Sequence, residues 1–221
     1  MQVQQIVAVT GAESGIGLAC VQAFAAAGAK VALLHFAKTD AMAAAVAAAG
    51  GNALAIQVDV RSEVSVEAGF AAAEAAFGPA NVLVNSAGLN QSGVTVADMA
   101  LAQWERLIAT DLTGAFLTSR RFVRSLHTVE AGGAIVNISS IHADDVRAGA
   151  ADYCAAKAGM KRLTETMALE EAKAGIRVNA IAPGMILTPM NERALDDAAY
   201  RKSLEANVPV GRAGTPEEVA G

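Results

Sequence analysis

The sequence predicts an α/β fold in which a doubly wound parallel sheet is covered by helices on both faces. Short apolar runs of strand length alternate with longer, Ala-rich helical stretches along the whole chain. The apolar runs are nearly continuous, as expected for strands buried on both faces of a sheet. A glycine-rich turn from Gly11 to Gly17 joins the first apolar run to the first helical stretch. This order of strand, turn and helix is typical of parallel α/β proteins.

Length and composition indicate one domain, spanning residues 1–221. A chain of 221 residues that is 53% apolar can bury one core and is short for two. The net charge of -5 and the scattered basic residues argue against a nucleic-acid partner. No apolar run reaches the ~20 residues that span a membrane, and the segment 1–5 lacks a basic leader region. We therefore expect a soluble, cytoplasmic protein, and the two cysteines show no metal-ligand spacing.

The predicted elements follow one another without a long linker. The expected strands are 5–10, 30–35, 53–59, 82–85, 134–138 and 177–182. The clearest helical stretches between them are 16–27, 40–49 and 62–77.

The turn after the first strand has the properties of a dinucleotide site. Glycine permits a tight turn and the close approach of a pyrophosphate, whose charge the amino terminus of the next helix then favours. The cofactor-binding candidates in this turn are Gly11, Ser14, Gly15, Ile16 and Gly17.

Two further strands end in residues that could contact a cofactor. Asp59 ends the third strand, where its carboxylate could accept a hydrogen bond from an adenine amino group. It could equally cap the following helix, for which Ser62 is also available. Small residues after the fourth strand leave room for a ribose, although a simple turn would also use them. The candidates in these segments are Asp59, Val60, Asn85, Ala87 and Gly88.

A candidate catalytic group follows the fifth strand. Tyr153 and Lys157 are four residues apart, so a helix places both on one face. A phenol ordinarily has a pKa of about 10, and a neighbouring cation favours the phenolate that acid-base chemistry needs. Ser140 follows the fifth strand, 13 residues before Tyr153. The carboxyl end of a strand is where open α/β sheets place their ligands.

Together these motifs resemble those of the short-chain dehydrogenase/reductase superfamily over essentially the whole chain. The resemblance rests on the glycine turn, the segment 85–88, Ser140, the Tyr153-x-x-x-Lys157 motif and Pro183-Gly184, in that order. It implies a Rossmann-like fold. The segments 139–142 and 183–191 also resemble those of glucose dehydrogenases.

The resemblance implies an oxidoreductase that moves a hydride between NAD(P) and a carbonyl or secondary alcohol, with a sugar or polyol as one candidate. Ser140 would hold the substrate oxygen, Tyr153 would carry the proton, and Lys157 would also bind the nicotinamide ribose. His142 would contact substrate, unless it is merely a solvated loop residue. The residues that would flank the nicotinamide by resemblance are Pro183, Gly184, Ile186 and Thr188.

Asp111 departs from the family pattern, which usually has Asn at this position to hold a water of the proton relay. A carboxylate could still hold that water, but its charge would pair with Lys157 and weaken the effect of that cation on Tyr153. We expect activity with a shifted pH optimum. The alternative is a dinucleotide-binding protein with little or no turnover, because of Asp111 or an incomplete carboxyl end.

The choice of cofactor depends on the end of the second strand. NAD-preferring relatives have an acid there for the ribose 2'-hydroxyl, whereas this chain has Lys38 nearby, which could meet a 2'-phosphate. Glu13 in the glycine turn would oppose that phosphate. The balance weakly favours NADP over NAD. The alternative is that Lys38 is a solvated loop residue and does not bind a phosphate.

The chain's last helix begins with a capping box at Thr215 and Glu218. Relatives continue beyond this point into a last strand that pairs with the sixth. We expect the fold to lack the rest of that helix and the strand, which would leave an exposed sheet edge. The completed edge would favour a homo-oligomer.

Overall fold

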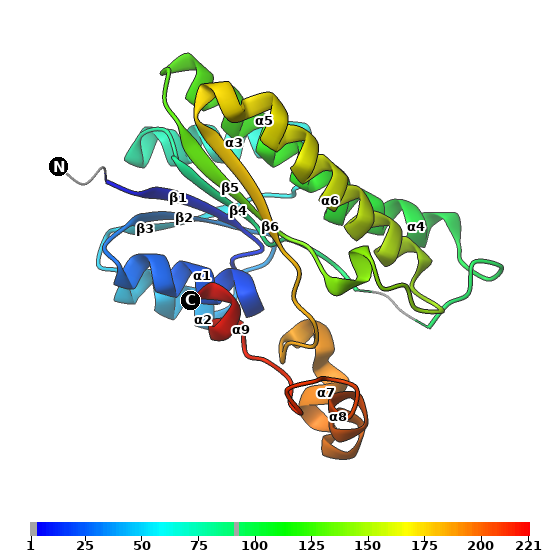
Figure 1. Ribbon diagram of the computed structural model, residues 1–221. Helices are drawn as coiled ribbons and strands as arrows, with labels where there is room; N and C mark the ends of the chain where they lie inside the picture. The colour runs from blue at the N-terminus through cyan, green and yellow to red at the C-terminus, as the bar shows by residue number, and fades with distance from the viewer. Residues whose placement is uncertain (1–3, 91–92) are drawn as a thin grey trace.

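Six parallel strands form the centre of the molecule, in the order β3-β2-β1-β4-β5-β6 (Figure 1). The structure is a computed structural model that describes residues 4–90 and 93–221. Residues 1–3, part of the segment on which the argument against a leader rests, lie outside it. The strands are β1 Ile6–Thr10, β2 Lys30–His35, β3 Ala53–Gln57, β4 Val82–Asn85, β5 Gly133–Ile138 and β6 Ile176–Ile181. Each lies within two residues of its predicted range at either end, and the doubly wound fold is confirmed.

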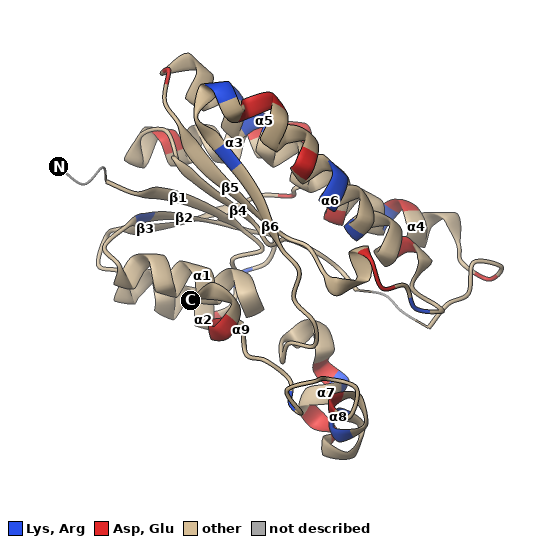
Figure 2. Cartoon of the chain, viewed as in Figure 1, with Lys and Arg blue, Asp and Glu red and all other residues tan. Residues whose placement is uncertain are grey.

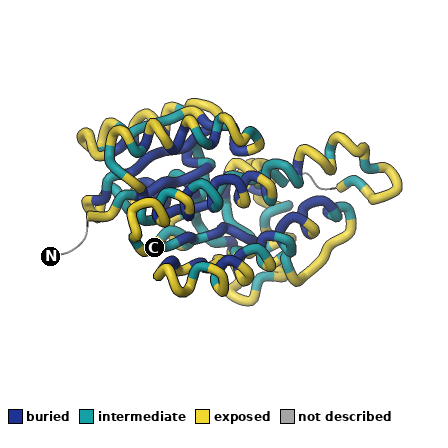
Figure 3. Tube along the Cα trace, turned by 90° about the horizontal axis from the view of Figure 1, so that it is seen from above, coloured by how far each residue is buried: buried dark blue, intermediate teal, exposed yellow. Residues whose placement is uncertain are grey.

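Helices cover both faces of this sheet (Figure 1). On one side lie α1 (Gly15–Ala26), α2 (Asp40–Ala48) and the short α9 (Pro216–Ala220). On the other lie α3 (Glu63–Phe77), α5 (Gly114–Thr128) and α6 (Ala151–Glu171), and α6 also contacts α4 (Leu101–Ile108). The view from above shows the buried strands between helices that expose their outer sides (Figure 3).

Alternate residues of β1, β2 and β4 belong to two separate apolar cores, whereas β6 contributes to one of them only. Val7 and Val9 of β1 pack with Cys20 of α1, whereas Ala8 packs in the core that contains Phe70 of α3. This alternation follows from the two-residue period of a strand. Lys, Arg, Asp and Glu lie mainly on the helices and loops, and few of them lie on the strands (Figure 2).

Short elements connect these layers. They are the π-helical turn η1 (Ala109–Thr113), the 3-10 turns η2 (Ile141–Ala143), η3 (Ala172–Ala174) and η4 (Pro189–Asn191), and the helices α7 (Glu192–Asp196) and α8 (Ala198–Glu205). Figure 1 shows α7 and α8 beyond the carboxyl end of β6, away from the sheet. No helix within residues 4–90 and 93–221 is long and apolar enough to cross a membrane.

The order of the strands reverses between β1 and β4, so the chain leaves these neighbours toward opposite faces of the sheet. Ligands of open α/β sheets bind at such a switch point. Thr10 holds the junction together, because its hydroxyl accepts hydrogen bonds from the amides of Ser86 and Ala87, both 3.1 Å long. The ends of β1 and β4 are thus fixed side by side.

The carboxyl end of the chain has the predicted capping box. The Thr215 hydroxyl accepts from the Glu218 amide at 3.3 Å, and the Glu218 carboxylate accepts from the Thr215 amide at 2.9 Å. The five-residue α9 packs against α1, which supports a helix too short to be stable alone. In the described part of the chain β6 pairs with β5 alone. That relatives complete the β6 edge with a further strand stays a prediction.

Candidate active site

A cavity of about 590 Å³ opens at the carboxyl ends of the strands, a size typical of sites for small molecules and cofactors. Segments far apart in the sequence form its wall. The predicted site residues that line it are Gly11, Ser14, Gly15, Ile16, Asp59, Val60, Ala87, Gly88, Ser140, His142, Tyr153, Lys157, Pro183, Gly184, Ile186 and Thr188. Four others, Gly17, Lys38, Asn85 and Asp111, do not belong to the wall.

Two glycines of the turn, Gly11 and Gly17, are packed too tightly to carry a side chain. A Cβ on Gly11 would lie 2.8 Å from the Cα of Ala87, and Gly11 has a positive φ of 62°. A Cβ on Gly17 would lie 2.2 Å from the carbonyl oxygen of Gly11, so Gly17 supports the turn from behind rather than lining the cavity. Ser14 precedes α1, and its side chain makes no capping hydrogen bond. The first amides of α1 therefore lack a side-chain cap, which suits a bound anion.

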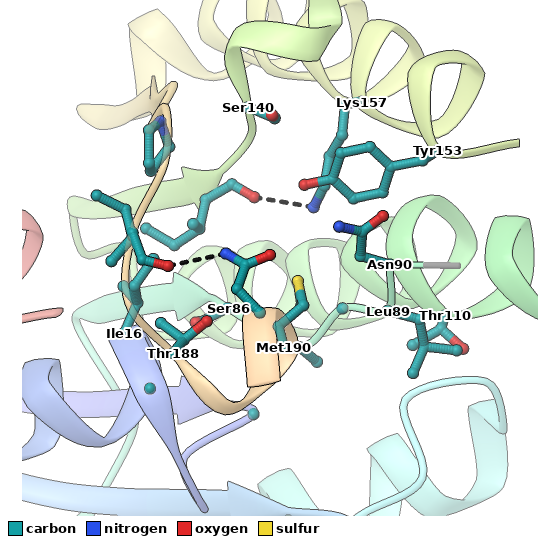
Figure 4. A pocket seen from close by; sticks show the side chains of 18 of the residues that line it. Ile16, Ser86, Leu89, Asn90, Thr110, Ser140, Tyr153, Lys157, Thr188 and Met190 are labelled. Carbon is teal, nitrogen blue, oxygen red and sulfur yellow. Dashed lines mark hydrogen bonds between the residues drawn. The ribbon is translucent and has the colours of Figure 1, made fainter. Parts of the chain in front are cut away.

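Tyr153 and Lys157 project together from α6 into the other end of the cavity (Figure 4). Both are more than nine-tenths buried. The Lys157 ammonium donates to the carbonyl oxygen of Ile138 at 3.1 Å and lies 5.5 Å from the centre of the Tyr153 ring. The spacing of four residues thus has the predicted result, a cation held beside a phenol on one helix face.

Ser140 enters the cavity from the loop after β5. Its hydroxyl accepts from the His142 amide at 3.1 Å, and the next residue, Ile141, donates its amide to the Pro183 carbonyl at 3.1 Å. The loops after β5 and β6 are thereby joined. The His142 ring stands edge-on to Tyr153, with the ring centres 6.2 Å apart. Because His142 Nδ1 lies 2.7 Å from the Asp145 carbonyl, Nδ1 carries the proton.

Asp111 lies behind the cavity wall and pairs with Lys157, as predicted. It belongs to the π-helical turn η1, a deformation that often occurs at functional sites. The completely buried carboxylate accepts from the Leu89 amide at 2.8 Å and lies 3.2 Å from the Lys157 ammonium. Burial raises the pKa of Asp111, and the nearby Lys157 opposes this rise. No feature of the sequence indicated the π turn at this position.

Asn85, predicted to adjoin the cofactor, is instead part of a buried polar network. Its amide group donates to Ser119 at 2.9 Å and Asn137 at 2.8 Å, and its carbonyl oxygen accepts from Thr118 at 2.7 Å. The cavity wall after β4 begins with Ser86. Asn85 therefore acts on the site through the end of β4, because its polar atoms are already occupied.

Asp59 forms an ion pair that the sequence analysis missed. Its carboxylate accepts from Nε and Nη2 of Arg61, at 2.8 and 2.7 Å, and this guanidinium lowers the pKa of Asp59. Arg61 also lines the cavity and lies over the Phe36 ring, 5.4 Å from its centre. Ser62, and not Asp59, caps α3. The two-residue spacing of Asp59 and Arg61 is a weak signal, since such spacing rarely brings side chains together.

The substrate end of the cavity is built largely from residues without a motif. Residues of the loop after Ser140 and of the segment 188–207 contribute to it. Lining residues that no sequence signal singled out include Leu89, Asn90, Arg106, Thr110, Arg147 and Val208. Within the described residues, no cluster of three His, Cys, Asp or Glu side chains could hold a metal ion.

Comparison with known proteins agrees with this geometry. A family model described as enoyl-(acyl carrier protein) reductase matches residues 11–221. The 3beta-hydroxysteroid dehydrogenase 1 of Eggerthella lenta is 39% identical over 217 residues, which are 97% of this chain and 83% of that protein. Glucose 1-dehydrogenase 2 of Bacillus subtilis is 34% identical over 215 residues, covering 96% and 83%.

A solved structure has the same fold throughout. The short-chain type dehydrogenase/reductase from Mycobacterium marinum superposes with a TM-score of 0.90 at 33% identity, covering 98% of this chain and 85% of that one. The chain therefore belongs to the short-chain dehydrogenase/reductase superfamily, a class of NAD(P)-dependent oxidoreductases. Glucose dehydrogenase is among its relatives, as the motifs at 139–142 and 183–191 indicated.

Proposed function

We propose that this protein oxidises a secondary alcohol, or reduces the corresponding carbonyl, with NAD(P) as the hydride carrier. One observation carries the proposal. A single cavity has Ser140, Tyr153 and Lys157 at one end and the glycine turn with the uncapped start of α1 at the other. A dinucleotide fits this arrangement, because its pyrophosphate can meet the uncapped amino terminus of α1 beside the glycine turn.

The chain's own residues would move the proton. Ser140 donates a hydrogen bond to the substrate oxygen, and Tyr153 takes the hydroxyl proton during oxidation or returns it during reduction. Lys157, held by the Ile138 carbonyl, places its positive charge beside the Tyr153 ring and binds the nicotinamide ribose. Bound NAD(P) supplies the complementary hydride chemistry at the substrate carbon. The Pro183 carbonyl accepts a hydrogen bond from the Ile141 amide and so keeps the loop that carries Ser140 in place.

The substrate end of the cavity favours a hydroxylated ring with an apolar body over a sugar or polyol. Its lining includes Leu89, Ile141, Met185, Met190, Leu204 and Val208. Arg106, Thr110 and Asn207 in the same lining could pair some hydroxyl groups, and a hydroxyl left facing the apolar side chains would lower affinity. A sugar remains the second candidate, on the glucose dehydrogenase resemblance. The ratio of kcat/KM for a 3-hydroxysteroid to that for glucose distinguishes them, and a ratio below one favours the sugar.

Substitution of Tyr153 by Phe tests the mechanism. We expect Tyr153→Phe to lower kcat by about 10² to 10⁴, the contribution of a general acid or base, while the calorimetric Kd for the cofactor stays within about threefold. The matched control is Tyr200→Phe, because Tyr200 of α8 does not line the cavity. Equal turnover of Tyr153→Phe and the wild type would refute the proposal.

A second candidate is a dinucleotide-binding protein with little turnover, which the buried contact between Asp111 and Lys157 favours. The carboxylate competes with Tyr153 for the effect of the cation. Cofactor binding without turnover of any ketone or alcohol would support this candidate. If the protein is instead active, Asp111→Asn should move the acidic limb of its pH-rate profile to lower pH. An unchanged profile would show that Asp111 does not act through Lys157.

The proposed partners are the dinucleotide and a small-molecule substrate, with no nucleic acid. Residence in the cytoplasm and assembly into a homo-oligomer stay predictions from the sequence. Sedimentation velocity at several protein concentrations would measure the oligomeric state directly.

A further inference from the structure

Glu13 lies at the end of β2, although it belongs to the glycine turn after β1. Its carboxylate Oε1 accepts from the Phe36 amide at 3.4 Å, and its carbonyl oxygen accepts from the Thr39 hydroxyl at 2.8 Å. These two contacts join the glycine turn to the segment between β2 and α2. Both Glu13 and Phe36 line the cavity. The turn therefore brings an acid to a strand end that has none of its own.

The Glu13 carboxylate has unused capacity to accept hydrogen bonds. Its Oε2 atom is buried and has no hydrogen-bond partner among the residues that the structure describes. A buried carboxylate oxygen without a donor is costly, so native proteins rarely leave one unexplained. Oε1 also keeps a lone pair beside its long bond to Phe36. The last torsion of a Glu side chain is soft, so either oxygen can turn toward a donor in the cavity.

The charges around this part of the cavity sum to a negative value. Asp59 and Arg61 neutralise each other in a two-bond ion pair, which leaves Glu13 as the excess charge. Lys38, the cation on which an NADP preference would rest, is exposed and does not line the cavity. A phosphate monoester carries about -1.5 to -2 charge at neutral pH, and Glu13 would repel it.

We infer that Glu13 binds the hydroxyl groups of the adenosine ribose and selects NAD over NADP. In dinucleotide folds this task belongs to an acid at the end of the second strand, and an Arg there accommodates the 2'-phosphate instead. Here Glu13 supplies the acid from the preceding turn. Arg61 is already held in an ion pair with Asp59. The inference rests on the proposed function and reverses the weak NADP preference that Lys38 suggested.

Isothermal titration calorimetry of NAD⁺ and NADP⁺ with the whole protein tests this inference without any substrate. For the wild type we expect NAD⁺ to bind at least about tenfold more tightly than NADP⁺. Glu13→Gln keeps the shape of the side chain and removes its charge, so it should reduce this preference about tenfold, chiefly by tighter NADP⁺ binding. The control Glu105→Gln makes the same charge change at an exposed position of α4 that does not line the cavity, and should keep the wild-type ratio.

Three results would overturn the inference, and they differ in what they mean. NADP⁺ binding as tightly as NAD⁺ to the wild type would refute the role of Glu13 and leave the proposed function intact. The same would follow if Glu13→Gln kept the wild-type ratio. Failure of the wild type to bind either dinucleotide would overturn the proposed function as well.

Discussion

Lys157 is shared among three groups that together define the site. Its ammonium contacts the Ile138 carbonyl, the Asp111 carboxylate and, more distantly, the face of the Tyr153 ring. Asp111 also holds the loop after β4 through the Leu89 amide. An Asn side chain could accept the same amide bond without the charge. The carboxylate therefore changes the electrostatics of the site more than its shape.

The pH dependence of stability should reveal the buried Asp111. Burial raises its pKa above the ordinary value of 3.8, so the folded state holds this proton more tightly than the unfolded chain. Asp111 then contributes stability below about pH 4 that is lost as the pH rises through the folded-state pKa. Relative to the wild type, Asp111→Asn should gain free energy of unfolding from about pH 4 to pH 7, by ~1.4 kcal/mol for each unit of pKa difference.

Urea unfolding at several pH values measures this difference. The control Asp196→Asn alters an exposed carboxylate of α7, and its difference from the wild type should stay nearly constant with pH. A constant difference for Asp111→Asn would mean that its contact with Lys157 cancels the effect of burial. The pH trend is the useful quantity, because removing one partner of a buried pair also has a pH-independent cost.

Among the secondary-structure elements, β4 and β5 are joined to the helices by a buried polar network. Asn137 of β5 accepts from Asn85 of β4 and donates to Thr164 of α6, both at 2.8 Å. Asn85 continues the network to Ser119 of α5. Because directional bonds fix register more strictly than apolar contacts, this network positions the strand ends from which the site's loops depart.

Substitution of Asn137 by Ala should destabilise the fold by about 2 to 3 kcal/mol, because it removes the acceptor of one buried Asn85 proton and the donor to Thr164. Urea unfolding measures the loss. The control is Asn179→Ala, in an exposed position of the neighbouring β6, where we expect a change within about 0.5 kcal/mol. Similar losses for the two variants would show that the network contributes little to stability.

For the molecule as a whole, the cavity connects segments from the first strand to the region beyond α8. Gly11 and Val208 both line it, although they lie at opposite ends of the chain. The α7 and α8 region stands away from the sheet (Figure 1). A ligand that contacts both the sheet and the α7 and α8 region would therefore stabilise the position of that region relative to the sheet.

The Tm of the 221-residue chain should increase when NAD⁺ is added. At 100 times its Kd, a ligand that binds only the folded state stabilises it by about 2.7 kcal/mol. For a domain of this size that corresponds to a Tm increase of about 5 to 10 °C. Sodium chloride at equal ionic strength is the control and should give a smaller shift. Equal shifts with salt and with NAD⁺ would argue against a dinucleotide site.

The fold and most of the site could be predicted because their signals are local. Continuous apolar runs specify buried parallel strands, and each observed strand ends within two residues of its predicted end. The glycine turn and the Tyr153-Lys157 spacing carry their chemistry in short segments, since a helix places positions four apart on one face. These motifs predicted which strand ends meet at the cavity without any knowledge of tertiary contacts.

The tertiary structure decided how charges are paired across these segments. The spacing of Asp59 and Arg61 does not show that they bind each other, and the hydrogen bond from the Phe36 amide to Glu13 is a tertiary contact. Asn85 and Lys38 illustrate the same limit. The side chain of Asn85 is already hydrogen-bonded in the core, and Lys38 does not line the cavity. A side chain's partner depends on which segments the sheet brings together. The sequence therefore determined the class of enzyme, whereas the folded chain decided which charges line its cavity.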